Sequence, residues 1–210
     1  MRNLVLACLV IGLLFACKQN NPEPAVESPS TSQYWSFENR DDQYTGGIKM
    51  IPIETELGTF RVWTKRIGNN PTKKVLLLHG GPGMTHELYE CADGYFPQEE
   101  IEYIYYDQLG SYYSDKPDDL SLWTTERFVE EVEQVRQALG LDKDNFYLLG
   151  QSWGGILAME YALKYQENLK GLVISNMMSS VPEYNAYAQN VLGPQMDAEV
   201  YAEIKAIEEA

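Results

Sequence analysis

The sequence is short of histidine, cysteine and positive charge. Its 210 residues include 2 histidines, 3 cysteines and 16 lysines and arginines, against 31 aspartates and glutamates. The formal net charge of -15 argues against nucleic acid as a partner, because a phosphate backbone is bound through clustered basic side chains. A hydrophobic fraction of 44% is sufficient for a substantial core, so we expect one globular domain.

A long hydrophobic run is also missing. The apolar stretch from Leu4 to Phe15 has 12 residues, fewer than the ~20 needed to cross a bilayer. It follows Arg2 and leads into Ala16 and Cys17, so residues 1–17 resemble a bacterial lipoprotein signal peptide with lipid attachment at Cys17. The resemblance implies a protein of the cell envelope, periplasmic or surface-facing, that is anchored to the membrane through this lipid. An ordinary cleaved signal is the alternative.

Residues 18–33 contain three prolines and three serines, which predicts a disordered, extended tether. If Cys8 leaves with the signal and Cys17 carries lipid, Cys91 is the single free thiol and no intramolecular disulfide can form. We expect Cys91 to be a small buried hydrophobic residue.

Alternation of apolar segments and helical patterns predicts an α/β fold with a mostly parallel sheet and flanking helices. Residues 47–67 should form an antiparallel hairpin at the sheet edge, and 73–79 a strand buried on both faces. Further strands are expected at 101–107, 145–149 and 169–175, and helices at 125–139 and 156–165. This incomplete core would extend over residues 34–176.

Two helical patterns follow one another at the end of the chain with no strand between them. Ser180 and Glu183 fit a capping box, and a strongly helical run follows Asp197. We therefore assign residues 177–210 to the beginning of a helical cap.

A sharp turn is predicted around Ser152. The apolar run FYLLGQSWGG, residues 146–155, ends in Gly150-Gln151-Ser152-Trp153-Gly154 and leads directly into a helical pattern. This is the pattern of a nucleophile elbow, in which a strained turn projects a serine hydroxyl toward a general base. Glycine is needed at positions 150 and 154 because the neighbouring strand and helix leave no room for a side chain.

A second glycine-rich loop follows the strand at 73–79. Its residues are His79, Gly80, Gly81, Pro82 and Gly83. Attack on a carbonyl creates an oxyanion, which fixed backbone N-H groups stabilise. We assign the two donors to the N-H groups of Trp153 and Gly81, with the rest of the loop in support.

A general base is missing from the expected place, since no histidine follows Ser152. We expect His79 to orient the oxyanion loop and His86 to have a surface or capping role. Either would require an unusual triad order to serve as the base.

The motifs HGGPG at 79–83, YDQLGS at 106–111 and GQSWGG at 150–155 resemble those of the α/β-hydrolase superfamily and, within it, the proline iminopeptidase family. The resemblance covers roughly residues 40–210. It implies a serine aminopeptidase that forms an acyl-enzyme on Ser152 and releases an N-terminal residue, typically proline, from a peptide with a free N-terminus. It also implies that a triad aspartate and histidine come later in the chain. Many relatives have Asp-Gln-Arg-Gly where this chain has Asp107-Gln108-Leu109-Gly110, and we assign Asp107 and Gln108 a loop-organising role.

The missing triad partners favour a sequence that stops within the cap, and such a fragment should be inactive alone. A full-length pseudoenzyme is the rival interpretation. An esterase or amidase of the same fold and a non-catalytic ligand-binding envelope lipoprotein are the alternative functions.

No metal cluster or nucleotide loop is recognisable, so no cofactor is expected. Cap carboxylates of relatives bind the substrate's ammonium group, and the glutamates available here are Glu183, Glu199, Glu203, Glu208 and Glu209.

Overall fold

The computed structural model describes residues 31–208 of the chain. The predicted signal with Cys17 and residues 18–30 of the predicted tether lie outside this range, so the lipid anchor remains a prediction. The last residues of the tether belong to a short helix, α2 (Thr31–Tyr34). Within the described range, no helix is long and apolar enough to span a membrane.

Six strands form one sheet in the order β1-β2-β4-β3-β5-β6. In chain order they are β1 (Ile48–Thr55), β2 (Gly58–Ile67), β3 (Lys74–Leu78), β4 (Glu102–Asp107), β5 (Phe146–Gln151) and β6 (Gly171–Ser175). β1 and β2 make the predicted antiparallel hairpin at one edge, and β2 is also antiparallel to β4. The remaining pairs are parallel, so the predicted mostly parallel sheet is confirmed.

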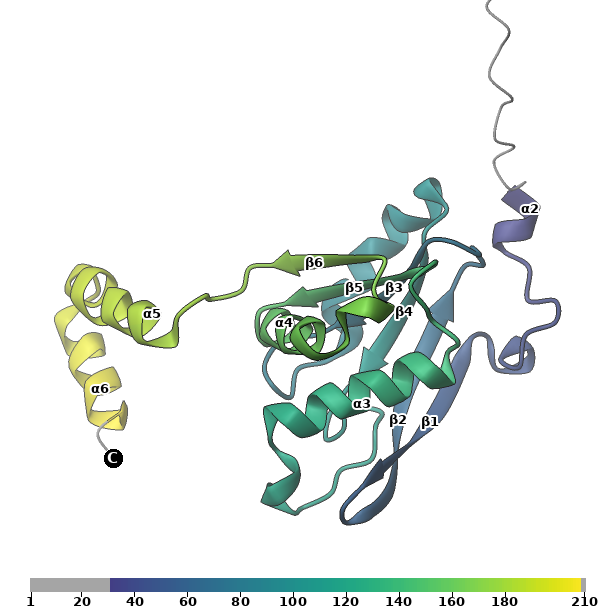
Figure 1. The fold of residues 1–210 in the computed structure, drawn as a ribbon. Helices are drawn as coiled ribbons and strands as arrows, with labels where there is room; N and C mark the ends of the chain where they lie inside the picture. Colours follow the sequence, from purple (N-terminus) through teal and green to yellow (C-terminus); the bar gives the residue numbers. More distant parts are fainter. Residues whose placement is uncertain (1–30, 209–210) are drawn as a thin grey trace, which may run out of the picture. The chain divides into compact units, whose positions relative to one another are not determined.

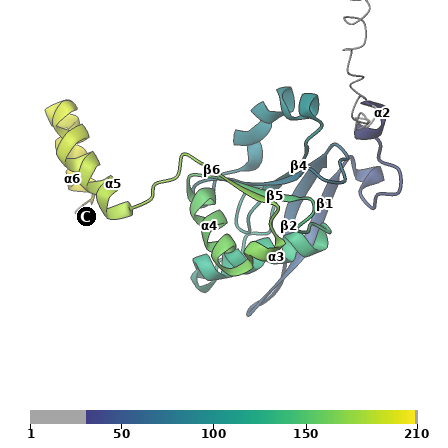
Figure 2. The same ribbon diagram turned by 45° about the horizontal axis from the view of Figure 1, so that its top comes forward.

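Helical segments cover both faces of the sheet. The α-helices after α2 are α3 (Thr125–Ala138), α4 (Trp153–Tyr165), α5 (Val181–Tyr187) and α6 (Ala198–Glu208). The shorter turns are η1 (Gln43–Thr45), η2 (His86–Gly94), η3 (Phe96–Glu99), η4 (Leu120–Leu122), η5 (Gln166–Asn168), η6 (Ala188–Leu192, a π-helix) and η7 (Gly193–Gln195). α3 and α4 lie side by side on one face (Figure 1), and η2 and η3 lie on the opposite face (Figure 2).

The strand β4 contacts the helical layers on both faces of the sheet, and all six of its residues are buried. On the face of η2 and η3, the hydroxyls of Tyr103 and Tyr105 each donate to Asp93 Oδ1 over 2.5 Å. On the other face, the Tyr106 hydroxyl donates to Glu131 of α3. Neighbouring residues of a strand point to opposite faces, so one short segment reaches both covering layers.

Helix boundaries follow local capping. The Thr124 hydroxyl accepts a hydrogen bond from Arg127 N at the start of α3, and Gly140, in the left-handed region at φ 64°, follows its end. α4 begins at Trp153, three residues before the predicted start, because the strained turn at Ser152 leads directly into helical backbone. At α5, one of the two hydrogen bonds of the predicted capping box is present, with Ser180 Oγ accepting from Glu183 N.

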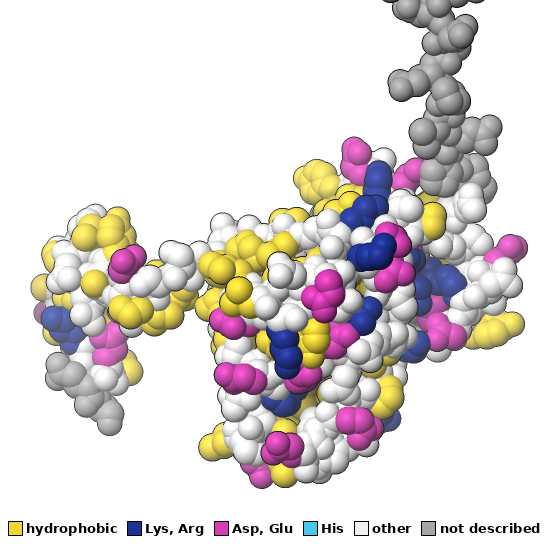
Figure 3. Space-filling model, viewed as in Figure 1, with side chains coloured by type: hydrophobic (Ala, Val, Ile, Leu, Met, Phe, Trp, Pro, Cys, Tyr) yellow, Lys and Arg dark blue, Asp and Glu magenta, His cyan; other side chains and the backbone are white. Residues whose placement is uncertain are grey.

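β6 differs from the other parallel strands because much of it is exposed. Leu172, Val173 and Ile174 keep 39%, 45% and 38% of their surface accessible. Hydrophobic side chains gather on the part of the surface that carries β6 (Figure 3). Within residues 31–208, β6 pairs with β5 and has no strand on its other side, so this exposed apolar strand forms one edge of the sheet.

The prediction for Cys91 is wrong. This residue lies in η2 and is exposed, with Sγ 3.6 Å from the carbonyl oxygen of Leu88. The 3-10 helix buries His86, Tyr89 and Ala92 instead, and Cys91 lies on its outer side.

Candidate active site

Ser152 lies at the tight turn between β5 and α4. Its backbone has φ 53° and ψ -121°, a conformation that costs free energy in any residue other than glycine. Three backbone hydrogen bonds hold this conformation, and the longest runs from Ile156 N to Ser152 O over 3.3 Å. Ser152 N donates to the carbonyl oxygen of Ser175 at the end of β6 over 3.0 Å, and Gly155 N donates to Ser152 O over 2.9 Å.

The glycines on either side of Ser152 are required by close backbone contacts. A Cβ on Gly150 would lie 2.0 Å from Gly154 O, and a Cβ on Gly154 would lie 2.0 Å from Leu78 O of β3. Neither contact could be relieved by a side-chain rotation, since the opposing atoms belong to the backbone. The turn is therefore pressed directly against the end of β3.

The glycine-rich loop after β3 lies beside the serine. A Cβ on Gly80 would be 3.1 Å from Ser152 Cβ. Gly81 has φ 115°, and a Cβ there would lie 2.7 Å from Gly83 N, so only glycine fits. Within residues 31–208 the N-H of Gly81 has no acceptor in the protein. Trp153 is the first residue of α4, where a helix leaves its N-H groups without an intrahelical partner.

Gln108 connects the two loops. Its backbone N donates to His79 Nε2 over 3.1 Å, and its side-chain Nε2 donates to His79 O over 3.1 Å. Its Oε1 accepts from the indole Nε1 of Trp153 over 3.1 Å. One buried amide thus links the oxyanion loop to the elbow, as expected of a loop-organising residue.

His79 is held in one neutral form. Its Nδ1 is 2.9 Å from Gly80 O, and its Nε2 accepts from Gln108 N, so the proton is assigned to Nδ1. Burial lowers the pKa of His79, which favours the same neutral imidazole. The ring is completely buried and orients the loop, with both nitrogens already engaged.

The surface role predicted for His86 is wrong. This residue is buried, and both its backbone N and its Nδ1 lie 2.9 Å from Asp107 Oδ1. Its ring stacks on Trp63 with centroids 4.4 Å apart. The pair ties the start of η2, three residues after the 79–83 loop, to the end of β4.

Sequence reasoning did not single out Glu131 of α3. It is completely buried and accepts from Leu109 N over 2.9 Å, and it also pairs with Arg127. Burial lowers the pKa of Arg127 to about 10. The one sequence signal was the spacing of four residues between Arg127 and Glu131, which is common on exposed helices as well.

The structure places the 79–83 loop beside Ser152 through Gly80, and Trp153 follows Ser152 directly at the start of α4. The structure does not bring a base to them: within residues 31–208 no side chain is hydrogen-bonded to the Ser152 hydroxyl. The same described range contains no group of three His, Cys, Asp or Glu side chains placed to hold a metal.

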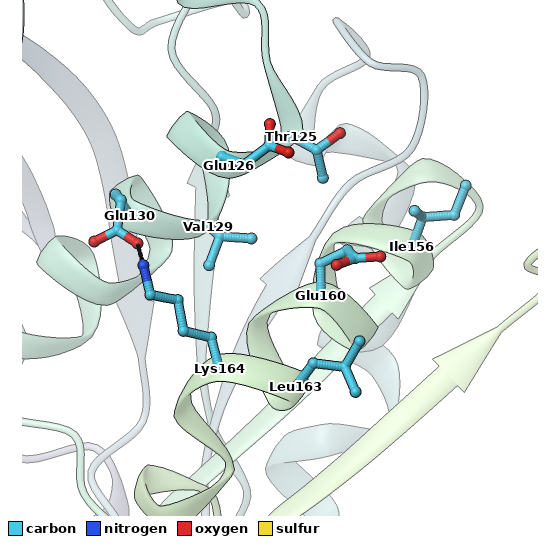
Figure 4. A pocket seen from close by; sticks show the side chains of 8 residues that line it. All are labelled: Thr125, Glu126, Val129, Glu130, Ile156, Glu160, Leu163 and Lys164. Carbon is cyan, nitrogen blue, oxygen red and sulfur yellow. Dashed lines mark hydrogen bonds and ion pairs between the residues drawn. The ribbon is translucent and has the colours of Figure 1, made fainter.

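A groove between α3 and α4 is lined by several charged side chains (Figure 4). Lys164 reaches across it to Glu130, with Nζ 2.5 Å from Oε1. Glu126 and Glu160 also line it. No residue of the 79–83 loop or the 150–154 turn does, so this groove is not the reaction site.

Comparisons with known proteins agree with the geometry. Residues 73–198 match the α/β hydrolase fold family. Proline iminopeptidases of Flavobacterium johnsoniae and Elizabethkingia meningoseptica are each 65% identical over 159 residues. The matched region is 76% of this chain and 54% and 53% of those proteins, so the chain spans about half the length of these curated relatives.

A solved structure is also similar. The crystal structure of proline iminopeptidase from Mycobacterium smegmatis has a TM-score of 0.65 and 29% identity, covering 77% of this chain and 54% of that one. The predicted α/β-hydrolase fold is confirmed by these matches.

Proposed function

Because the chain belongs to the proline iminopeptidase family of the α/β-hydrolase superfamily, we propose that it carries the nucleophile and oxyanion hole of a serine aminopeptidase. The substrate is a peptide with a free N-terminus, from which proline or another small residue is released. The observation that carries the proposal is the fit between two loops. Gly80 lies against Ser152, and the adjacent Gly81 N-H has no acceptor within the described residues.

The reaction follows from this arrangement. Ser152 Oγ attacks the carbonyl carbon of the first residue, and its proton passes to a general base. The carbonyl oxygen gains negative charge and accepts hydrogen bonds from the N-H groups of Gly81 and Trp153. When the intermediate collapses, the C-N bond breaks and the leaving amine takes the proton from the base. Water then hydrolyses the ester on Ser152 and regenerates the hydroxyl.

We propose that the general base corresponds to a residue in the part of the relatives that this chain does not cover. Both nitrogens of His79 are occupied. His86 pairs with Asp107 through Nδ1 and stacks on Trp63, and within residues 31–208 no hydrogen bond joins it to Ser152. An aspartate and a histidine on loops after later strands would complete the triad.

Turnover of a proline arylamide by the protein expressed from its complete reading frame tests the proposal. Ser152→Ala should lower kcat about 10⁴-fold or more, because the covalent route is lost while the oxyanion donors remain. The circular dichroism spectrum should not change. A fluorophosphonate probe should label the parent protein at Ser152 and leave the variant unlabelled, since labelling needs an activated hydroxyl.

Two controls separate the alternatives. Short-chain esters assayed in parallel would identify an esterase if they are hydrolysed while the arylamide is not. The 210-residue chain alone should show almost no turnover, because it lacks the base. A Ser152→Ala protein that cleaves the arylamide as fast as the parent would refute the role of Ser152.

A further inference from the structure

An aromatic pocket adjoins the oxyanion donors. It is a cavity of about 480 Å³, which is within the size range of small-molecule sites. We call it the Trp123 pocket. Its walls include Pro82 of the oxyanion loop, Gln108, Trp123, Phe128 and Trp153. Since Trp153 also supplies one oxyanion N-H, the pocket begins next to the reacting carbonyl.

The walls of the pocket are fixed by their neighbours. The rings of Trp123 and Phe128 are stacked with centroids 6.0 Å apart, and Phe128 meets Trp153 edge to face, also at 6.0 Å. Trp123 rests on Gly110, where a Cβ would lie 2.3 Å from its ring. These contacts hold three flat aromatic surfaces around one space, and Trp123 remains 38% exposed.

Two polar side chains line the pocket, Gln108 and Thr125, and that of Gln108 is already engaged. The side-chain amide of Gln108 donates to His79 O and accepts from Trp153 Nε1. In the part of the chain that the structure describes, no charged side chain lines the cavity, although the protein has a formal net charge of -15. A charged group would therefore lose its hydration without gaining a partner, whereas a flat apolar group would gain ring contacts.

We propose that the Trp123 pocket is a substrate subsite for a flat apolar group next to the scissile bond, and that Trp123 determines specificity there. The inference rests on the proposed function in treating Ser152 as the reacting residue. The apolar group belongs either to the residue that is released or to the leaving side of the substrate. Both sources share the same chemistry, and ligand pairs can distinguish them.

The test measures dissociation constants by titration calorimetry in a Ser152→Ala background, so that ligands stay intact. It uses the protein from the complete reading frame. Prolyl-2-naphthylamide is compared with prolinamide, which lacks the aromatic leaving group. Phenylalaninamide is compared with alaninamide, which lacks the aromatic side chain of the first residue. Trp123→Ala should weaken the aromatic member of one pair about tenfold and its partner less than about twofold.

Three further variants make the result specific. Trp123→Phe should restore most of the affinity, because it keeps a flat ring. Trp35→Ala removes an indole that is 51% exposed and should change none of the four constants. If Trp123→Ala does not fold, Trp123→Leu carries the same comparison, since it fills apolar space without a flat face.

An effect on the proline pair places the leaving group in the pocket, and an effect on the amide pair places the first residue there. Unchanged constants, or an equal loss for all four ligands, would refute the subsite. Failure of the proposed function would look different. In that case the aromatic ligand would still depend on Trp123, while the parent protein would turn over none of the four compounds.

Discussion

β3 and β6 have similar apolar sequences, and both run parallel to β5, yet their surroundings differ. Four of the five residues of β3 are buried, whereas the three central residues of β6 are exposed. β3 has a strand on each side and helical segments on both faces, whereas among residues 31–208 β6 has β5 as its single strand partner. The burial of a strand thus depends on its neighbours as well as on its own sequence. The 79–83 loop of the candidate active site follows β3, the strand that is covered on all sides.

The largest effect is expected where the elbow touches β3. In Gly154→Ala, the new methyl carbon would lie 2.0 Å from the Leu78 carbonyl oxygen, and relief requires α4 to move away from the sheet. We expect a loss of at least about 3 kcal/mol in the free energy of unfolding, measured with urea. Gly94→Ala is the matched control, because a Cβ there has no atom within 4 Å. Equal stability of the two variants would contradict the packing described.

A second prediction concerns pH and the residue that follows β3. Burial lowers the folded-state pKa of His79, so the unfolded chain binds a proton more readily than the folded one. Stability contributed by the neutral ring is complete above the unfolded pKa of about 6.5 and is lost as the pH falls below it. This single group can contribute a slope of at most about 1.4 kcal/mol per pH unit.

The measurement compares the parent protein with His79→Gln by urea unfolding between pH 7.5 and 5. Other groups titrate in this range, so the difference between the two proteins isolates His79. The parent should lose more stability on acidification than the variant. Parallel curves would mean that His79 is not held neutral by burial.

The smallest change in stability is expected for a substitution on β6, and it tests the difference in burial between β3 and β6. Val75 of β3 is in register with Tyr147 of β5, and Tyr147 with Gly171 of β6. Val173 is two residues after Gly171, so it lies on the same face of the sheet as Val75. Val75→Thr should cost about 1–2 kcal/mol of unfolding free energy, since its hydroxyl is buried. Val173→Thr should change stability by less than about 0.5 kcal/mol. A larger cost at position 173 would show that β6 is covered in solution.

The core of the fold and the elbow could be predicted from sequence because their signals are local. A half-buried strand, two glycines and an apolar helix follow one another within residues 146–165. Close backbone contacts explain why Gly150 and Gly154 are glycines. The start of α4 was missed by three positions, since a helical pattern does not reveal where a strained turn ends.

Residues whose role depends on distant partners could not be predicted. His86 is buried because Asp107 and Trp63 arrive from other strands, and the exposure of Cys91 follows from the same packing of η2. Glu131 has the sequence context of a surface residue, but it meets Tyr106 and Leu109. The Trp123 pocket could not be predicted from sequence for the same reason, because its walls come from four separate segments of the chain.

The tyrosines of β4 have a mechanical consequence. Tyr103 and Tyr105 hold the η2 segment through Asp93, and Tyr106 holds α3 through Glu131. The helical layers on the two faces of the sheet are therefore attached to the same strand. A displacement of β4 along its axis would disturb both layers together, and the loop that carries Gln108 would move with the strand.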